Sequence, residues 1–563
     1  MRRILTGLAL LVLLPGAARA GELAAALPEG RLASLRVPSG RALFDSGPVQ
    51  RALDRLRQAG ALAELEQGRA ALRAATGSDP AEWLETLLGG EIQAAVYEGR
   101  ASRLAPEGAA GRRLLLAAAR LRDADAGQRA LDAALAVLDG DAANDVRRNR
   151  YRDVPFARIN RELVVACHGD VLLLGNDDDL LALALDRLLD GAAPAEAAPA
   201  GEGLLAFRFD PEVLRPKDWK PAAGEARRAL GRRIANPLGN LLFGGLLAGD
   251  GPVSGWLDAE SDGLELHLAL PPAPADAPVA WFPPGAPGFA VPVSSETVAV
   301  LAVRRDLADW WRQRETLMSE ESQPQLAKTD ETLSLLFMGG SPAEDVFAAL
   351  EEELALVVDR QTFAGVAVPD VKLPAACLVA RLKDPESFGP SMAVAFQTLM
   401  GFINTERAQE RRQPFLLDAV EHAGATVRAA RLLPGRDGQR PGTEANASPA
   451  VAVRGDWLLV GTSLEQVLRL LTALEQGALR PVDGAHLALQ LDGARALRLA
   501  HDNRDVLLAQ SILEDGLAAV DASRHIDDLL ALLGEVAHLD LSVTPRADSL
   551  ELALRVVLAG RAP

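Results

Sequence analysis

Two acidic runs are the residues of this sequence whose types and spacing most resemble a metal site. They are Asn176-Asp177-Asp178-Asp179 and the shorter Asp123-x-Asp125-x-Gly127. Carboxylate and amide oxygens bind hard cations such as Ca²⁺, but about six or more of them must converge. The second run has Ala134 where a calcium loop carries its bidentate glutamate. Each run directly precedes an amphipathic segment, where Asp and Asn accept hydrogen bonds from the free N–H groups of a helix start. We therefore interpret both as helix caps and predict no metal site.

The histidines give no catalytic or zinc pattern. None is spaced from another as zinc ligands on one helix are, and the sequence lacks G-x-S-x-G, Walker A and H-E-x-x-H motifs. We predict no catalytic residue, no cofactor and no cofactor-binding residue. A Ser-His-Asp arrangement assembled from distant segments remains an alternative. The histidines are His168, His267, His422, His486, His501, His525 and His538.

Two further features suggest recognition. Trp310 and Trp311 are adjacent on an expected helix, so their side chains point about 100° apart and cannot share one narrow buried stripe. Either one of them is exposed as a binding residue, or a long insertion covers the second ring. A basic cluster in an acidic chain could hold a ligand or pair with neighbouring carboxylates. Its members are Arg227, Arg228, Arg232 and Arg233.

The elements that carry these residues occur in the same order twice. Gly169–Asn176 (GDVLLLGN) matches Gly455–Thr462 (GDWLLVGT), and Leu116–Asp123 (LAAARLRD) matches Cys377–Asp384 (CLVARLKD). The order of the matches is the same in both halves, which is typical of a duplicated module. Three further pairs keep this order: Ile92–Val96 with Leu354–Val358, Leu181–Leu188 with Val467–Leu474, and Asp262–Leu266 with Asp548–Leu552.

The module reads as α+β, with a mainly antiparallel sheet and helices packed on one face. In the first copy we expect strands near Ala33–Val37, Glu91–Tyr97 and Arg113–Arg120, and a helix over Ala124–Leu138. A tight hairpin follows, turning at His168-Gly169-Asp170, and two strands, Val253–Ala259 and Leu264–Leu270, close the copy. Hairpins outnumber crossovers, which favours antiparallel pairing.

The domain organisation follows from the repeats and the linkers. Residues 21–270 form the first α+β module and residues 293–563 the second, which opens with a strand at Thr297–Val303. Between them, residues 271–292 are rich in Pro, Ala and Gly, as a linker is. The second copy has insertions near 313–342 and 433–449, and such surface insertions often carry function.

Residues 1–20 predict export by a Sec-type signal peptide. Arg2 and Arg3 precede an apolar run at Ile4–Leu14, and Ala18-Arg19-Ala20 supplies a cleavage site after Ala20. The apolar run is shorter than the roughly 20 residues that span a bilayer, so an N-terminal anchor is the less favoured alternative. We expect a periplasmic or secreted protein with no membrane span after cleavage.

The charge and the cysteines narrow the partners and the redox chemistry. Cleavage would remove three arginines and no acidic residue, taking the net charge from −18 to −21. So acidic a body repels nucleic acid, which we exclude as a partner. Cys167 and Cys377 could pair in an oxidising compartment, but both lie in apolar runs, which favours two buried thiols.

The segments GDVLLLGNDDDLLALALDRL (169–188) and WFPPGAPGFAVPVS (281–294) resemble exported bacterial families of unknown function. One such family is encoded beside bacterial alpha-2-macroglobulin-like proteins of the envelope. The resemblance implies an envelope location and a protein partner such as that macroglobulin-like protein, and it transfers no catalytic residue. We therefore expect a non-catalytic periplasmic interaction or scaffold protein. A periplasmic hydrolase with its site between the repeats and a small-ligand carrier are the alternatives.

Overall fold

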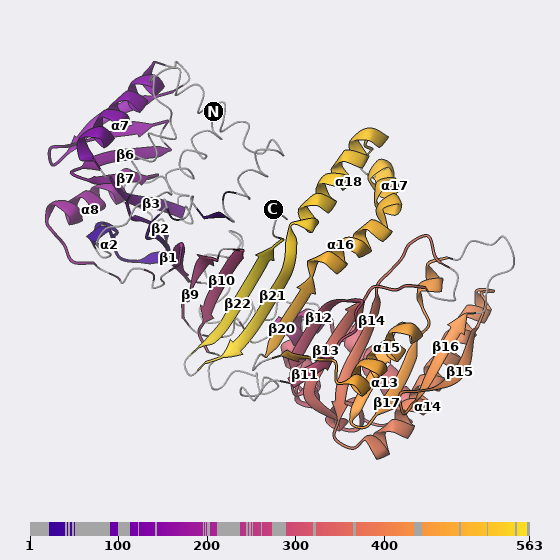
Figure 1. Ribbon diagram of the computed structural model, residues 1–563. Helices are drawn as coiled ribbons and strands as arrows, with labels where there is room; N and C mark the ends of the chain where they lie inside the picture. Colours follow the sequence, from indigo (N-terminus) through magenta and orange to yellow (C-terminus); the bar gives the residue numbers. More distant parts are fainter. Residues whose placement is uncertain are drawn as a thin grey trace. The chain divides into compact units, whose positions relative to one another are not determined.

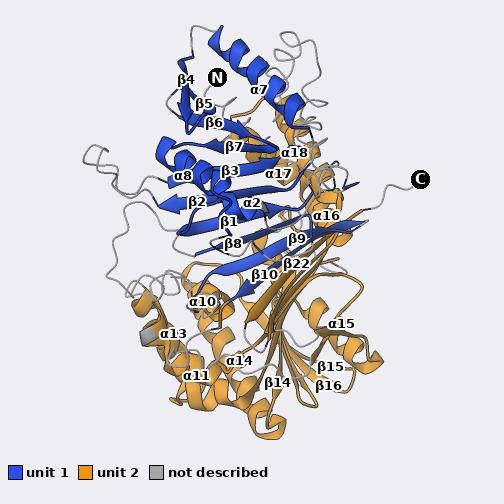
Figure 2. Cartoon of the chain, turned by 90° about the vertical axis from the view of Figure 1, so that its left-hand side faces the viewer, with its two compact units in different colours: residues 1–222, 251–270 blue, residues 223–250, 271–563 orange. Residues whose placement is uncertain are grey.

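The structure is a computed structural model that describes most of residues 22–559. The longer gaps are 51–89, 99–112, 211–236, 273–288 and 433–441, so the predicted signal peptide and the basic cluster around Arg228 lie outside the described residues. The chain divides into two compact units, shown in Figure 2. The first comprises residues 1–222 and 251–270, and the second comprises residues 223–250 and 271–563. Residues 223–250 thus group with the second unit, although they precede the predicted boundary at 270.

The first unit contains one antiparallel sheet of ten described strands, in the order β4-β5-β6-β7-β3-β2-β1-β8-β9-β10. The expected antiparallel pairing is confirmed. Its elements are α2 (Glu22–Ala26), β1 (Arg31–Val37), β2 (Ile92–Glu98), β3 (Arg113–Arg120), α7 (Ala124–Asp139), β4 (Val146–Tyr151), β5 (Val154–Ile159), β6 (Leu163–His168), β7 (Val171–Gly175), α8 (Asp178–Leu189), β8 (Leu205–Phe209), β9 (Val253–Ala259) and β10 (Gly263–Leu270).

Helices cover both faces of this sheet, so the expectation of helices on one face is wrong. Strand β6 shows why, because its successive side chains point to opposite faces. Val164 and Ala166 belong to the core that contains Leu181 and Leu185 of α8. Val165 and Cys167 belong to a second core, which contains Ala130 and Leu135 of α7. A strand that is apolar at every position is the signature of a sheet covered on both sides.

In the second unit, seen in the pink to yellow part of Figure 1, ten strands pair antiparallel in the order β15-β16-β17-β18-β14-β13-β12-β20-β21-β22. These strands, with the two helices α14 and α15, are β12 (Thr297–Arg304), β13 (Leu350–Asp359), β14 (Ala375–Leu382), α14 (Pro385–Gln409), β15 (Phe415–His422), β16 (Ala425–Leu432), β17 (Ala450–Arg454), β18 (Trp457–Gly461), α15 (Leu464–Gln476), β20 (Leu487–Asp492), β21 (Val536–Pro545) and β22 (Leu550–Leu558). A two-stranded sheet pairs β11 (Phe289–Pro292) with β19 (Leu479–Val482).

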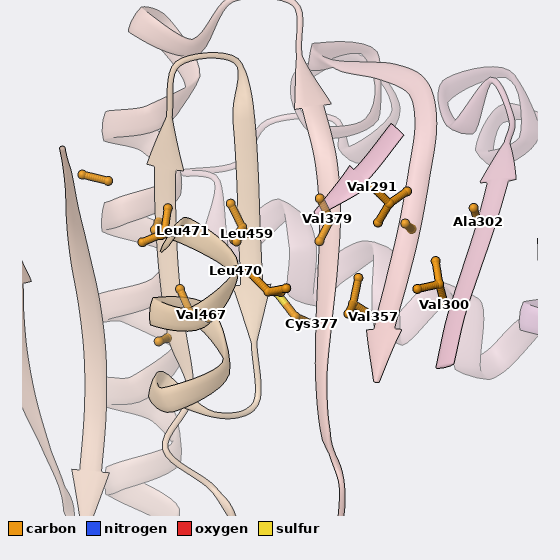
Figure 3. Packing of buried hydrophobic residues seen from close by; sticks show 14 of the residues in the cluster. Val291, Val300, Ala302, Val357, Cys377, Val379, Leu459, Val467, Leu470 and Leu471 are labelled. Atoms are coloured by element: carbon orange, nitrogen blue, oxygen red, sulfur yellow. The ribbon is translucent and has the colours of Figure 1, made fainter. Parts of the chain in front are cut away.

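The core of the second unit also has helices on two sides. In Figure 3, Val467, Leu470 and Leu471 of α15 pack over side chains of the sheet such as Cys377 and Leu459. On β17, Ala450 and Ala452 face this core, whereas Val453 on the other face lies beside Gly389 of α14. The one-face expectation therefore fails here as well.

Further helices of the second unit flank its sheet. The predicted insertion near 313–342 is largely helical, whereas residues 433–441 of the other insertion lie outside the described residues. Three helices after β20 form an arm, α16–α18, which packs mainly on itself and on β21. The elements are α10 (Pro237–Phe243), α11 (Leu307–Arg312), α12 (Arg314–Leu317), α13 (Gln323–Leu336), η3 (Pro342–Val346), η4 (Phe347–Ala349), η5 (Thr443–Asn446), α16 (Gly493–Asp502), α17 (Arg504–Glu514) and α18 (Ala519–Gly534). No helix in the described part of the chain combines the length and apolar character needed to cross a membrane.

Candidate functional site

The acidic runs cap helices, as interpreted from the sequence. The Asp123 carboxylate accepts a hydrogen bond from the Ala126 N–H at 2.8 Å, at the start of α7. Asp177 does the same for α8, accepting from the Leu180 N–H at 3.0 Å. Asp178 pairs with Arg158. Over the described residues, no group of three or more His, Cys, Asp or Glu side chains is placed to hold a metal ion.

The two units repeat specific polar contacts at positions that the sequence matches. Arg120 pairs with Asp170 in the first unit at 2.6 Å, and Arg381 pairs with Asp456 in the second. The hairpin turns beside these aspartates use glycines with the same left-handed φ of 57°. Such a φ is one that only glycine adopts without strain. These contacts hold one strand to the next hairpin, so they are structural.

The histidines lie apart in different environments. His168 is exposed at the first hairpin turn, and His267 stacks on Trp256 with ring centroids 4.6 Å apart. His422 Nε2 lies 2.8 Å from the Thr472 hydroxyl. His486 is buried, and this burial together with the positive charges of Arg305 and Arg304 lowers its pKa to about 3. A neutral, enclosed imidazole of this kind is a packing residue.

Both tryptophans of the Trp310–Trp311 pair are buried, which supports the covering interpretation. The Trp311 indole N–H donates to Asp330 of α13 at 2.8 Å, so the helix of the insertion does cover this ring. The Trp310 indole donates to the Asn240 side chain of α10 at 3.3 Å. Neither ring is available to bind a partner.

Cys167 and Cys377 are free, buried thiols, as the sequence favoured. Burial, with the nearby negative charges of Asp132 and Asp170, raises the pKa of Cys167 to about 11. Burial also raises the pKa of Cys377, with Asp359 adding to the effect. A thiol that stays protonated is a poor nucleophile and a poor metal ligand.

Arg305 holds the short helix α10 to the second unit. Its guanidinium is fully buried and donates to the carbonyls of Leu241 and Leu242, both at 2.9 Å, near the end of α10. It also donates to the carbonyls of Arg304 and His486. Burial lowers the Arg305 pKa to about 9, which leaves the side chain charged at neutral pH.

The arm α16–α18 exposes several large apolar side chains. At its tip, Leu513 is 83% exposed at the end of α17 and Val520 is 71% exposed at the start of α18. Leu529 and Leu532 are also exposed on α18. Large apolar side chains grouped on one element mark interaction sites more often than isolated ones do.

The sequence also carries a signal for this arm, although no motif marks it. Leucines at 529, 530, 532 and 533 are too many for one buried stripe of a single helix. Leu530 is buried in the arm, and the remaining leucines are left partly or largely exposed.

No protein-family model matches the sequence, and no curated protein matches it either. Among solved structures, the chain is distantly similar to TP0453 from Treponema. Crystal form IV is 8% identical with a TM-score of 0.26, over 45% of this chain and 81% of that one. Crystal form I is 11% identical with the same TM-score, over 46% and 82%. Likeness at this level assigns no function.

Proposed function

We propose that this chain is a non-catalytic interaction or scaffold protein of the bacterial envelope. It is exported by the signal peptide at 1–20, acts in the periplasm or outside the cell, and contains two tandem copies of one module. The proposed partner is another protein, and the resemblance of the sequence points to an alpha-2-macroglobulin-like protein of the envelope.

The strand registers support the duplication. In the first sheet Leu116 lies opposite Gly175, and in the second Cys377 lies opposite Gly461. The matched sequence segments align Leu116 with Cys377 and Gly175 with Gly461, so the two strand pairs correspond. Both sheets have the same strand order, and the strand pairs β1–β2 and β12–β13 carry a register shift at matching places, Arg31/Ala33 and Thr297/Ala299.

The proposed cleavage site precedes two buried leucines of the first core. Leu23 and Leu27 are fully buried in the first core, beside α8. A cut after Ala20 would leave both side chains in the mature protein.

The exposed tip of the arm is the observation that carries the interaction role. Burying an aliphatic side chain of this size contributes about 1.5–3 kcal/mol to association. The tip is also acidic, since exposed Glu514 and Asp521 flank Leu513 and Val520. Acidic groups are repelled by anionic lipid, so a protein surface is the favoured occupant over a membrane.

Binding of the mature protein to the macroglobulin-like protein of the same envelope tests the proposal. We expect Leu513→Ser/Val520→Ser to weaken binding by about tenfold or more, because two buried apolar contacts are lost. Met338→Ser is the matched control, since Met338 is 85% exposed elsewhere in the second unit. Equal affinity of the wild type, the double variant and the control would rule out the arm as the binding surface. Quantitative mass spectrometry of envelope proteins that co-purify with each form tests other protein partners.

A further inference from the structure

Each of the two sheets ends in a strand that is paired on one side only. Strand β4 pairs with β5, and β15 pairs with β16; in the described part of the chain no strand lies against their outer sides. The outer N–H and C=O groups of such an edge can add a strand from another chain.

The strand registers identify which residues of the two edges correspond. Counting inward from the first edge, Arg147 lies opposite Arg158, Arg158 opposite Val164, and Val164 opposite Gly175. In the second sheet the same path runs from Asp418 to Ala429, Ala450 and Gly461. Because Gly175 and Gly461 correspond, Arg147 corresponds to Asp418. The same path places Arg150 in correspondence with Glu421, since these residues lie opposite Pro155 and Thr426.

The charges at these corresponding positions are opposite. The first edge carries exposed Arg147 and Arg150, and the second carries Asp418 and Glu421 with the same spacing of three residues. Arg147 does have an acidic neighbour within its own chain, since it pairs with Asp145 at 2.9 Å. Both side chains are about half exposed, so this ion pair contributes little to stability. Arg147 can therefore leave Asp145 and pair with an acidic residue of another chain.

The second edge also exposes apolar area. Leu416 is 47% exposed and Leu417 is 49% exposed on β15. A long, partly apolar edge strand is a site where another strand adds. Asp418 pairs with Arg431 of β16 within its own sheet, whereas Glu421 is exposed and its side chain contacts Thr426.

We propose that β4 of one copy of the chain pairs with β15 of a second copy, which extends the sheet from one molecule to the next. Antiparallel pairing that sets Arg150 opposite Asp418 also sets Arg147 opposite Glu421. It places Tyr151 opposite Leu417 as well, a cross-strand pair of the kind that stabilises sheets. The inference deepens the proposed interaction role by naming a second copy as one partner, and it uses no residue of the arm.

The competing explanation is that the edge charges prevent pairing, as charged side chains do on many natural edge strands. The two explanations predict opposite effects of neutralising the arginines. If the charges attract a second copy, Arg147→Gln/Arg150→Gln weakens self-association. If they guard the edge, the same change strengthens it.

Sedimentation velocity of the purified mature chain decides between them. We expect the wild type to associate as its concentration rises in about 50 mM salt and to dissociate near 500 mM salt, where charge pairs are screened. Arg147→Glu/Arg150→Glu and Asp418→Arg/Glu421→Arg should each weaken self-association about tenfold or more. An equimolar mixture of these two variants should associate again, because an edge strand of one variant then meets an edge strand of opposite charge on the other variant.

The control variant Arg498→Glu/Arg524→Glu reverses the same number of exposed charges on the arm and should sediment as the wild type does. Thermal unfolding confirms that each variant is folded, and the glutamine variant serves if a charge reversal is not. A wild type that stays monomeric in low salt overturns the inference, as does stronger association of the glutamine variant or a mixture that fails to associate. Any of these results leaves binding by the arm untouched.

Discussion

The Arg305 guanidinium donates a hydrogen bond to the Leu241 carbonyl at 2.9 Å and so joins segments 64 residues apart in the chain. The side chain is fully buried and holds further carbonyls of Leu242, Arg304 and His486. Arg305 follows the predicted linker at residues 271–292, whereas α10 precedes it. Arg305 thus holds α10 within the second unit. Backbone carbonyls make this contact, so the identities of the α10 residues do not reveal it.

Replacing Arg305 with methionine should destabilise the second unit by about 3 kcal/mol or more, because several buried carbonyls lose their donor. The measurement is the urea dependence of unfolding followed by circular dichroism. Arg312→Met is the control, since Arg312 is about half exposed and pairs with Glu344 at the surface. We expect that control to change stability by less than about 1 kcal/mol. Equal effects of the two changes would contradict the role given to Arg305.

His486 should make the second unit lose stability as the pH falls. Its pKa is lowered from 6.5 to about 3 in the folded chain, so below pH 6.5 the unfolded chain binds a proton that the folded chain does not. The contribution of His486 to the unfolding free energy is therefore fully present above pH 6.5. It declines as the pH falls toward 3, by at most about 1.4 kcal/mol per pH unit.

His486→Gln should flatten the pH dependence of the unfolding free energy in this window, whatever its effect at neutral pH. Exposed His501 provides the control, and His501→Gln should leave the slope as it is in the wild type. The same slope in all three proteins would show that His486 is not the group that titrates.

The matching turn glycines predict matched effects in the two units. Gly169→Ala and Gly455→Ala should each destabilise by about 1 kcal/mol, because both residues adopt a φ of 57° and both have open space around them. Gly401→Ala should instead stabilise slightly, since Gly401 is an exposed position inside α14 without a positive φ. Chemical denaturation checks all three. A neutral effect at one turn and a large effect at the other would argue against equivalent hairpins.

Neither cysteine should react readily in the folded protein. The raised pKa of Cys167, about 11 against an ordinary value of 9, predicts labelling by a thiol reagent about a hundredfold slower than in urea. Cys377, which is fully buried, should label more slowly still. The time course of absorbance with Ellman's reagent provides the measurement. Fast labelling of either thiol in native buffer, or a disulfide in the oxidised protein, would contradict the assignment.

The sequence predicted the strands with alternating or continuous apolar residues. Strand β9 spans Val253–Ala259 and β3 spans Arg113–Arg120, as expected. The edge hairpin β4–β5 was missed because Val146–Tyr151 (VRRNRY) is charged rather than apolar, which is how an exposed edge reads. The helices on the second face were missed although β6 is apolar at successive positions, a signal of burial on both sides.

The candidate surfaces could be predicted only in part. The prediction that the acidic residues cap helices is confirmed for Asp123 and Asp384, which occupy matching positions at helix starts. It could not identify exposed residues such as Leu513, because exposure depends on which helices pack together. The correspondence of Arg147 with Asp418 likewise required the strand registers, since these segments share no sequence pattern.

Photo-cross-linking in living cells tests the proposed role of the arm most directly. A photoreactive amino acid replaces Leu513 at the tip, or Met338 as an equally exposed control. We predict that illumination links position 513 to one discrete envelope protein and that position 338 gives no such product. Absence of a product at 513, or the same products at both positions, would contradict the proposal that the arm binds a protein partner.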